Sequence, residues 1–398
     1  MSNILNFKSF LNFLGRNKGY TAIDLFGLSV SLMFVILIAT YVVGELSTDR
    51  FHEKGDRIYA LTNGESTGSA YQIGYRLEER YPEIEKSCHV LARAFYLPVQ
   101  SGEHKLNAGL MLVDTTFFDF FNFPLIRGNR DQAFAARNYA VISESFANKI
   151  FGNEDPMGKT IRVNDELTVV VNGVLKDIRH SVIPNEDIMC RIDNIRAVGQ
   201  NMFDDYNSAG SVNVFVMKRE GADLASKSDD IRDWFKTFFW IYERDLSTVV
   251  EFVPLKQLYF WNHTYSPGIE RGNRQFVIIL LSVGLLILLF AIINYINLTV
   301  AQTGFRAKEM ATRRLLGSSR KELFSRLIIE STLLTAISFC IGLFLAFLFA
   351  PYAGDLVQKQ IYPSEMITPL NGIIVILLIA FIGLAVVAGI AAIYRKVS

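Results

Sequence analysis

The sequence predicts an α+β membrane protein, with four transmembrane helices and a large two-lobed α/β domain between the first and second of them. Four apolar segments are each near or above the roughly 20 residues with which a helix crosses about 30 Å of hydrocarbon. Residues 45–272, between the first two segments, are of mixed polar composition and have the length of one or two independent domains. The protein is therefore expected to act across a bilayer.

The apolar segments determine how the chain is divided. They lie at 25–43, 276–301, 331–352 and 366–394. The predicted parts are a cytoplasmic amphipathic leader at 1–21, a first span at 22–44, the large domain at 45–272, a second span at 273–301, a cytoplasmic segment at 302–326, a third span at 327–352, a short outer loop at 353–365, a fourth span at 366–394 and a cytoplasmic tail at 395–398. In the leader, one helical face carries Ile4, Phe7, Leu11 and Leu14, as in a helix that lies on a membrane surface.

Basic residues set the orientation, because Lys and Arg beside a span tend to remain in the cytoplasm. The leader and the tail are basic, whereas the loop 353–365 has Lys359 as its one basic residue. The segment 302–326 is the richest, with Arg306, Lys308, Arg313, Arg314, Arg320, Lys321 and Arg326. Both termini are therefore expected in the cytoplasm, and the domain 45–272 is expected outside it.

The overall charge argues against a nucleic-acid-binding function. Hydrophobic residues make up 51% of the chain, yet 40 Lys and Arg balance 39 Asp and Glu, which leaves a net charge of +1. A nucleic-acid-binding protein needs a basic surface that faces phosphates, and here the basic residues gather at the edges of the spans. We expect contacts with lipid and no nucleic-acid partner.

The large domain shows both strand and helix patterns. Strand patterns fall at 57–62, 212–218 and 248–254, and helix patterns at 70–80 and at about 223–239. Their order indicates a small α/β sandwich. A β-rich lobe at about 95–205 is expected to be inserted into it. There, a strand at 141–143 leads into a short helix, and 160–163 is predicted to pair with 167–171 around Asn164, Asp165 and Glu166.

Two short motifs resemble catalytic signatures. The end of a phosphate-binding loop is matched by Gly158, Lys159 and Thr160, but Gly152 stands one position too far away and Pro156 interrupts the turn. The run GESTG, with Ser66 at its centre, fits the nucleophile pattern G-x-S-x-G, yet the region lacks the pattern of a large parallel sheet that carries an acid and a histidine. We interpret both as ordinary turns or loops and predict no catalytic residue.

The histidines and cysteines predict neither a metal site nor a cofactor. No two histidines stand at metal-ligand spacing, so ordinary surface or core histidines are expected. These are His52, His89, His104, His180 and His263. The predicted oxidising side holds Cys88 and Cys190, so their pairing in a disulfide stays open, while Cys340 is a small apolar residue of the third span.

Three polar residues fall within or at the edge of the predicted spans. Asn294 and Asn297 lie one turn apart in the second span, and Glu330 lies at the cytoplasmic entrance of the third. Such residues are costly in lipid unless they face protein or water. We expect interhelical hydrogen bonds that lock the bundle, rather than an ion or proton path.

The cytoplasmic segment is predicted to hold a short helix parallel to the membrane. Residues 305–316 have a helix-forming composition with an i,i+4 pair between Glu309 and Arg313, and Gly317 ends the helix. A capping box from Ser319 to Glu322 starts the next helix, which runs into the third span. A helix joined in this way to two spans cannot move without moving them. The alternative is an inert loop that merely follows the charge bias.

The same segment resembles a known family. Its sequence FRAKEMATRRLLGSSR, at 305–320, is similar to the cytoplasmic segment of ABC transporter permeases of the MacB/FtsX type. The runs ELSTDRFH at 45–52 and FGNEDPMGK at 151–159 resemble the versions found in Bacteroidetes permeases. Together the three motifs are specific, and the resemblance covers nearly the whole chain.

This resemblance implies a permease subunit of the bacterial inner membrane whose short helix is the coupling helix that docks into a separate ABC ATPase. ATP and Mg²⁺ would be bound by that partner, which closes and moves the coupling helices, and rigid spans would pass the motion to the outer domains. The expected result is export or extrusion of a peptide, drug or lipoprotein. The residues carried over as the coupling site are Phe305, Arg306, Lys308, Glu309, Met310, Arg313, Arg314, Leu316 and Gly317.

Several alternatives stay open. Some relatives of the FtsX kind transport nothing and activate periplasmic cell-wall hydrolases instead. A membrane-anchored sensor, or a hydrolase that uses Ser66, is a second alternative. Many Bacteroidetes relatives are longer and contain a second copy of the arrangement, so we expect either a half-size subunit that pairs with itself or another permease, or a truncated half. A periplasmic adaptor and an outer-membrane channel are further partners that the resemblance allows.

Overall fold

The computed structural model describes residues 18–198, 212–262, 266–301, 315 and 320–367. The chain divides into two compact units. One unit combines Met1–Leu46 with Arg274–Ser398, and the other is Ser47–Asn273.

The first unit is a set of long apolar helices, α2 (Lys18–Leu46), α9 (Arg274–Ala301) and α11 (Arg320–Val357), followed by a short 3-10 helix, η4 (Pro363–Ile367). In the described part of the chain, three stretches are long and apolar enough to cross a membrane, namely Leu25–Leu46, Arg274–Asn294 and Thr332–Val357. Most of the predicted fourth span, 366–394, lies outside the described residues, so the count of four stays a prediction.

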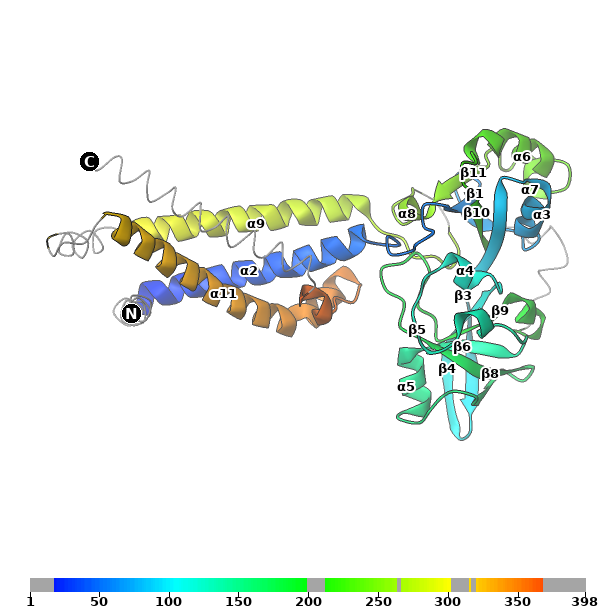
Figure 1. Ribbon diagram of the computed structural model, residues 1–398, viewed down its shortest axis with the longest axis horizontal. Coiled ribbons are helices and arrows are strands. Elements are labelled where there is room, and N and C mark those ends of the chain that lie inside the picture. Colours follow the sequence, from blue (N-terminus) through cyan, green and yellow to red (C-terminus); the bar gives the residue numbers. More distant parts are fainter. Residues whose placement is uncertain (1–17, 199–211, 263–265, 302–314, 316–319, 368–398) are drawn as a thin grey trace. The chain divides into compact units, whose positions relative to one another are not determined.

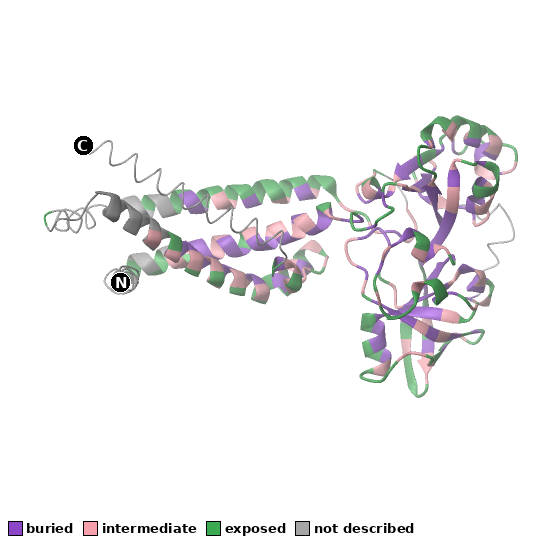
Figure 2. Cartoon of the chain, in the orientation of Figure 1, coloured by how far each residue is buried: buried purple, intermediate pink, exposed green. Residues whose placement is uncertain are grey.

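Helix α2 contacts both α9 and α11, and glycines bring the helix backbones close together (Figure 1). A methyl group placed on Gly342 of α11 would lie 2.9 Å from the carbonyl oxygen of Ser29 in α2. On the other side of α2, a methyl group on Gly284 of α9 would lie 3.1 Å from Cγ2 of Ile38. The remaining surface of α9 is mostly exposed, as expected of a helix that meets lipid (Figure 2).

An ion pair fastens the end of α2 to the turn that follows α11. The carboxylate of Glu45 lies 2.7 Å from Nζ of Lys359 and is almost completely buried. This turn is fixed by the end of α11, where the Lys359 amide donates to the carbonyl of Gly354 over 3.0 Å and Gln358 adopts a left-handed φ of 53°.

The second unit is built on an eleven-stranded mixed sheet, counted over the described residues. The strands are β1 (Ile58–Thr62), β2 (Gly68–Ser69), β3 (Ile84–Ser101), β4 (His104–Val113), β5 (Leu125–Gly128), β6 (Tyr139–Ser143), β7 (Thr160–Val163), β8 (Leu167–Leu175), β9 (Ile188–Arg191), β10 (Val212–Lys218) and β11 (Glu251–Pro254). Their order is β11-β1-β10-β3-β4-β9-β6-β8-β5, with β2 on β10 and β7 pairing with β3 and β8. The pairs β4–β9 and β6–β8 are parallel, and the others are antiparallel.

Short helices cover this sheet. They are α3 (Ile73–Arg80), α4 (Phe117–Phe120), α5 (Glu144–Phe151), α6 (Ser228–Phe235), α7 (Trp240–Glu243) and α8 (Leu255–Leu258), with 3-10 turns at Arg130–Gln132, Ile192–Val198 and Ala225–Lys227. We call β1, β2, β10 and β11 with α3, α6 and α7 the first lobe, and β4 to β9 with α5 the second lobe. Strand β3 pairs with β10 of the first lobe and with β4 and β7 of the second, so it runs through both (Figure 1).

Alternation along the strands separates the apolar cores. In β10, Val214 and Val216 face a core with α3 and α6, while Phe215 and Met217 face a second core that contains α4. A third core fills the second lobe between its strands and α5. Strong alternation predicted this strand at 212–218, and the prediction is confirmed.

Other local predictions from sequence are confirmed as well. Strand β1 falls within 57–62, and β6 leads directly into α5. Strands β7 and β8 pair from Thr160 with Val170 to Val163 with Leu167, and Asn164 in their turn has a left-handed φ of 52°. Asparagine tolerates that conformation better than most residues.

The helix predicted at about 223–239 is wrong in its extent. It begins as a 3-10 turn, and α6 ends at Phe235. The hydroxyl of Thr237 donates to the carbonyl of Trp234 over 2.7 Å, which competes with the helical hydrogen bonds of the backbone. The chain then turns and re-enters a helix only at Trp240.

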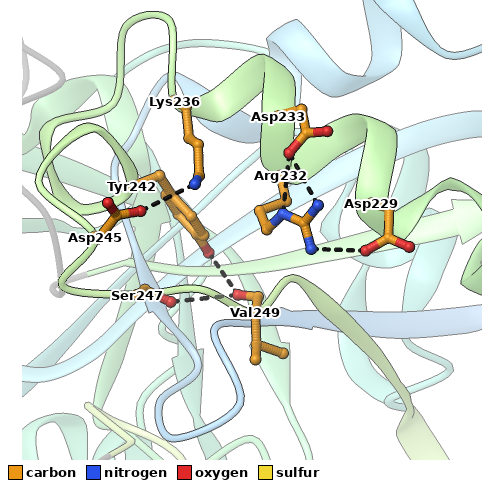
Figure 3. A network of polar contacts seen from close by, with 8 residues as sticks. All are labelled: Asp229, Arg232, Asp233, Lys236, Tyr242, Asp245, Ser247 and Val249. Atoms are coloured by element: carbon orange, nitrogen blue, oxygen red, sulfur yellow. Dashed lines mark hydrogen bonds and ion pairs between the residues drawn. The ribbon is translucent and has the colours of Figure 1, made fainter.

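The strand predicted at 248–254 starts later, at Glu251. The carbonyl of Val249 accepts the hydroxyl groups of Tyr242, over 3.2 Å, and Ser247, over 3.3 Å, rather than a neighbouring strand (Figure 3). Burial raises the pKa of Tyr242 to about 12, so its hydroxyl stays protonated and able to donate.

On α6, the Arg232 side chain pairs with Asp229 and Asp233 (Figure 3).

The contact between α2 and α11 leads to a first prediction. Replacing Gly342→Val should lower the free energy of unfolding by about 2 kcal/mol, because the added carbons overlap the backbone of α2 at Ser29. Thermal unfolding in detergent measures this effect. The matched control Cys340→Val adds a similar side chain at an exposed position of the same helix and should change the melting temperature little. Equal melting temperatures for the two variants would contradict the packing.

Candidate functional site

The two segments that connect the large domain to α2 and α9 meet at one loop. We name residues 47–53 the entry segment, 266–273 the exit segment and 176–187 the junction loop, which joins β8 to β9. The amide of Asp49 donates to the carbonyl of His180 over 2.9 Å, and the amide of Glu270 donates to the carbonyl of Val182 over 2.7 Å. Both covalent connections to the spans are thus fastened to the same few residues.

The entry segment also contacts the loop through the carboxylate of Asp49, which is fully buried. One of its oxygens accepts the hydroxyl of Ser181 over 2.5 Å, and the other accepts the amide of Val182 over 2.9 Å. The Ser181 oxygen in turn accepts the amide of Ile183 over 3.1 Å. Three consecutive residues of the loop are thus held by hydrogen bonds that start from one buried side chain.

The imidazole of His52 completes the entry segment. Its Nδ1 lies 3.0 Å from the amide nitrogen of Asn122 and accepts that hydrogen, so in the neutral ring Nε2 carries the proton. Nε2 lies 3.3 Å from the Asp49 carboxylate. The ring also packs edge-on against Phe121 and Phe123, with centroids 5.4 and 5.1 Å away. The entry segment is therefore held against the core that contains α4.

The exit segment lies against an irregular point of β3. The pairing register of β3 shifts between Leu91 and Phe95, and Arg93 has a left-handed φ of 55°. A methyl group on Gly268 would lie only 2.2 Å from the carbonyl oxygen of Ala92, which explains a glycine at this close approach. An ion pair between Arg93 and Glu270 holds the same two segments together.

The junction loop continues from these contacts into the second lobe. One carboxylate oxygen of Glu186 accepts the amide of Arg93 over 3.1 Å. The carboxylate of Asp187 accepts the amide of Gly109 in β4 over 2.9 Å, and its carbonyl accepts the amide of Ser143 in β6 over 3.0 Å. Burial raises the pKa of Glu186, and the Arg93 amide and charge oppose that rise.

The site residues predicted from sequence fall mostly elsewhere. Asn294 lies beside α2, since a methyl group on Gly27 would be 3.5 Å from its Nδ2, and the side chain of Asn297 is exposed. Glu330 lies in α11, and its side chain is outside the described residues. The coupling residues lie outside them too, namely Phe305, Arg306, Lys308, Glu309, Met310, Arg313, Arg314, Leu316 and Gly317. Their roles stay predictions.

The catalytic look-alikes form ordinary turns. In a phosphate-binding loop the backbone amides must be free to donate to phosphate. Here the Gly158 amide donates to the carbonyl of Val171 over 2.8 Å, and the Lys159 amide donates to the carbonyl of Pro156 over 3.1 Å. The hydroxyl of Ser66 accepts the amide of Gly68 over 3.0 Å within its own turn. The preceding strand β1 is antiparallel to both neighbours, whereas a nucleophile elbow needs a parallel sheet.

Two cysteines and two histidines of the large domain are buried, whereas His104 is exposed, His180 is partly buried and His263 lies outside the described residues. Both Cys88 and Cys190 are free and buried, and they belong to different cores, so the open question of a disulfide is answered by two separate thiols. Like His52, His89 is buried beside a carboxylate, with Nδ1 2.6 Å from Asp114. Over the described ranges, no group of three or more His, Cys, Asp or Glu side chains is arranged to hold a metal ion.

Sequence reasoning missed the junction itself. The run at 45–52 was interpreted only as part of a family resemblance. Asp49 and His52, three residues apart and directly after a span, are nevertheless an unusual polar pattern. The loop partners Ser181 and Glu186 carry no local signal, because their contacts with Asp49 and Arg93 bridge distant parts of the chain.

An α/β domain joined at both ends to long apolar helices, with both connections fastened to one of its loops, is the arrangement of a membrane protein that carries a folded domain between two of its spans. Comparison with known proteins identifies the family. The MacB-like periplasmic core domain model matches residues 21–234, more than half of the chain, and the FtsX-like permease C-terminal model matches 281–398. The chain belongs to the MacB/FtsX family of ABC transporter permeases.

Individual relatives are distant. The macrolide export ATP-binding/permease protein MacB of Aggregatibacter actinomycetemcomitans is 22% identical over 245 residues, which cover 60% of this chain. The match covers 35% of that relative, so the chain spans about a third of its length. Among solved structures, a domain from a protein described as a permease of Porphyromonas gingivalis has a TM-score of 0.41 at 19% identity, covering 51% of this chain and 92% of that one. The periplasmic region of MacB from Actinobacillus actinomycetemcomitans has a TM-score of 0.38 at 14% identity, covering 51% and 91%.

The Asp49 contacts lead to a second prediction. The substitution Asp49→Ala leaves the Ser181 hydroxyl and the Val182 amide without their partner in the interior. It also places alanine at a left-handed φ of 56°. Together these effects should lower the free energy of unfolding by about 3 kcal/mol. Replacing Asp49→Asn keeps an acceptor and a residue that tolerates this φ, and should cost about 1 kcal/mol. Denaturant unfolding of the full chain, followed by tryptophan fluorescence, measures both.

The matched control for this series is Asp56→Ala. Asp56 follows the entry segment and pairs with Lys256 over 2.7 Å, but its side chain is 82% exposed. Its removal should change the free energy of unfolding by less than about 0.5 kcal/mol. If the Asp49→Ala cost were as small as that of the control, the proposed anchor would be wrong.

The raised pKa of Glu186 leads to a third prediction. The Glu186 carboxyl group binds its proton more tightly in the folded protein than in the unfolded chain. Its contribution to stability is therefore full below the ordinary pKa of 4.5 and is lost as the pH rises through the raised pKa. Glu186→Gln keeps the acceptor for the Arg93 amide and removes this titration. The free energy of unfolding of the variant, relative to wild type, should therefore increase as the pH rises from 4.5.

Glu154 provides a control for which the change of stability with pH should have the opposite sign, because its hydrogen bond to Lys159 lowers its pKa. A carboxylate of this kind contributes stability above its ordinary pKa, and the contribution is lost as the pH falls through the lowered value. Relative to wild type, Glu154→Gln should therefore lose stability as the pH rises. Slopes of the same sign for both variants, from unfolding curves at a series of pH values, would contradict the Glu186 environment.

Proposed function

We propose that this chain is the permease subunit of an ABC transporter that works by mechanotransmission. A separate ATPase hydrolyses ATP, the spans carry the resulting motion, and the periplasmic domain responds by extruding or exporting a peptide, drug or lipoprotein. Family membership supports the class of protein, and the junction supports the transmission of motion. The observation that carries the proposal is the fastening of the entry and exit segments, which continue into α2 and α9, to one loop.

The arrangement of the first unit supports the same proposal. Close glycine contacts hold α2 against α9 and α11, and the Glu45–Lys359 ion pair holds the outer ends of α2 and α11. Packed helices move as rigid elements rather than bending at each contact. A displacement applied at the segment between α9 and α11 would therefore reach α2 and the entry segment.

The proposed division of labour leaves ATP and Mg²⁺ with the partner. In this chain, the segment around Arg313 and Arg314 would bind the ATPase, and no residue would act as a catalyst. The subunit would sit in the bacterial inner membrane with both termini in the cytoplasm, and it would pair with a second permease, either identical or different.

A fourth prediction tests the partnership. Co-expression with an ABC ATPase encoded beside this chain should yield a complex whose ATP hydrolysis is stimulated by the permease. Replacing Arg313→Glu together with Arg314→Glu should weaken that complex by about 3 kcal/mol, because two charge reversals in a contact surface introduce repulsion and leave partner charges unpaired. Affinity purification and ATPase assays in lipid nanodiscs measure the loss.

The matched control reverses two charges elsewhere on the predicted cytoplasmic side, with Arg16→Glu and Lys18→Glu. This variant should retain the complex and the stimulation. An unaffected complex in the Arg313→Glu, Arg314→Glu variant would refute the assignment of the coupling segment, and absence of any complex with the wild-type chain would refute the proposed function.

A further inference from the structure

We propose that the junction loop is the element through which α2 and α9 jointly drive the second lobe, and that Asp49 is the positioning residue that connects the entry segment to it. This inference rests on the proposed function, and it assigns a route for the motion within the large domain. The first lobe is connected to the spans directly along the chain, because the entry segment leads into β1 and the exit segment follows β11 and α8. The second lobe has no such direct connection among the described elements.

The junction loop provides the missing connection. Residues 180–182 receive the entry segment through the Asp49 amide and carboxylate, and the exit segment through the Glu270 amide. A displacement of either segment therefore displaces the same three residues. Because both segments bind at adjacent positions, α2 and α9 act on the loop together rather than at separate points of the domain.

The loop is built to transmit displacement rather than absorb it. Unlike most connections, which lie on the surface, it buries the side chains of Ile178, Val182 and Ile183 in the core that contains α4. The side chain of Asn185 accepts the amide of Ile178 over 2.8 Å and so braces the loop across its width. A braced and buried loop moves as one piece.

Both ends of the loop lead into the second lobe. Its first end continues from β8, which pairs with β5, β6 and β7, and its last end enters β9, which pairs with β4 and β6. Asp187 adds direct hydrogen bonds to Gly109 in β4 and Ser143 in β6. Movement of the loop therefore reaches the second lobe through covalent links and through hydrogen bonds.

The two lobes can respond differently because β3 is irregular where they meet. The shift in register between Leu91 and Phe95 interrupts the regular ladder at the point where the exit segment contacts Ala92 and Arg93. A bulge bends and twists its strand locally, which makes this point a natural hinge. Motion of the loop would then turn the second lobe relative to the first about this part of β3.

Amide hydrogen exchange of the full chain, in nanodiscs with its ATPase, tests this route. Nucleotide-free and vanadate-trapped complexes are compared, and exchange is followed in peptides that contain Val182, Gly109 and Ser143, and in β1 and β10 of the first lobe. In the wild type, trapping should change exchange in the junction loop and in the second lobe. In Asp49→Asn, which weakens only the side-chain contacts of the entry segment, the change at Gly109 and Ser143 should be smaller than in the wild type while the change in the first lobe persists.

Two further variants separate transmission from simple destabilisation. Asp56→Asn removes a nearby exposed carboxylate and should retain the wild-type response in both lobes. Asp49→Cys combined with Ser181→Cys replaces the hydrogen bond with a covalent link, and should show the full second-lobe response when oxidised and a smaller one when reduced. General weakening of the domain would not be reversed in this way.

The outcomes are distinct. A second-lobe response as large in Asp49→Asn as in the wild type, or an oxidised cysteine pair that fails to restore it, would overturn this inference while leaving the proposed function in place. A wild-type complex that forms but shows no response to trapping in the second lobe would also overturn it. Failure of the wild-type chain to bind any ATPase would instead overturn the proposed function on which the inference rests.

Discussion

The buried carboxylate of Asp49 is the contact on which the connection between spans and domain depends. A buried carboxyl group is tolerated in the interior only where hydrogen bonds replace its lost hydration, and here the Ser181 hydroxyl and the Val182 amide do so. The energy that favours these bonds is also what holds the junction loop in place. The loop also accepts the exit segment through the Glu270 amide, so the two chain connections are positioned side by side on it.

A second acid lies four residues earlier and performs the equivalent task in the membrane unit. Glu45 binds Lys359 and fixes the end of α2 to the turn after α11, whereas Asp49 fixes the entry segment to the junction loop. The chain between the two α-carbons can extend to at most about 14 Å. The two fastened points are therefore separated by a short stretch of chain.

The sequence was most informative where a local pattern determines structure. Long apolar runs indicated the spans, alternation indicated β10, and the turn at Asn164 indicated the β7–β8 hairpin, because each depends on neighbouring residues alone. The helix at 223–239 was misjudged because the Thr237 side chain competes for a backbone carbonyl, which periodicity does not reveal. The junction was missed for a different reason. Asp49 and Ser181 are separated by 132 positions, and the loop between β8 and β9 has neither alternation nor helical period.

The central claim is that the second lobe follows the spans through the junction loop. Pulsed electron paramagnetic resonance between spin labels at Lys105 in the second lobe and Glu243 in the first measures this most directly, with the chain and its ATPase in nanodiscs. The account predicts that vanadate trapping shifts the distance distribution in the wild type and shifts it less in Asp49→Asn. An identical shift in both proteins, or no shift in the wild type, would contradict it.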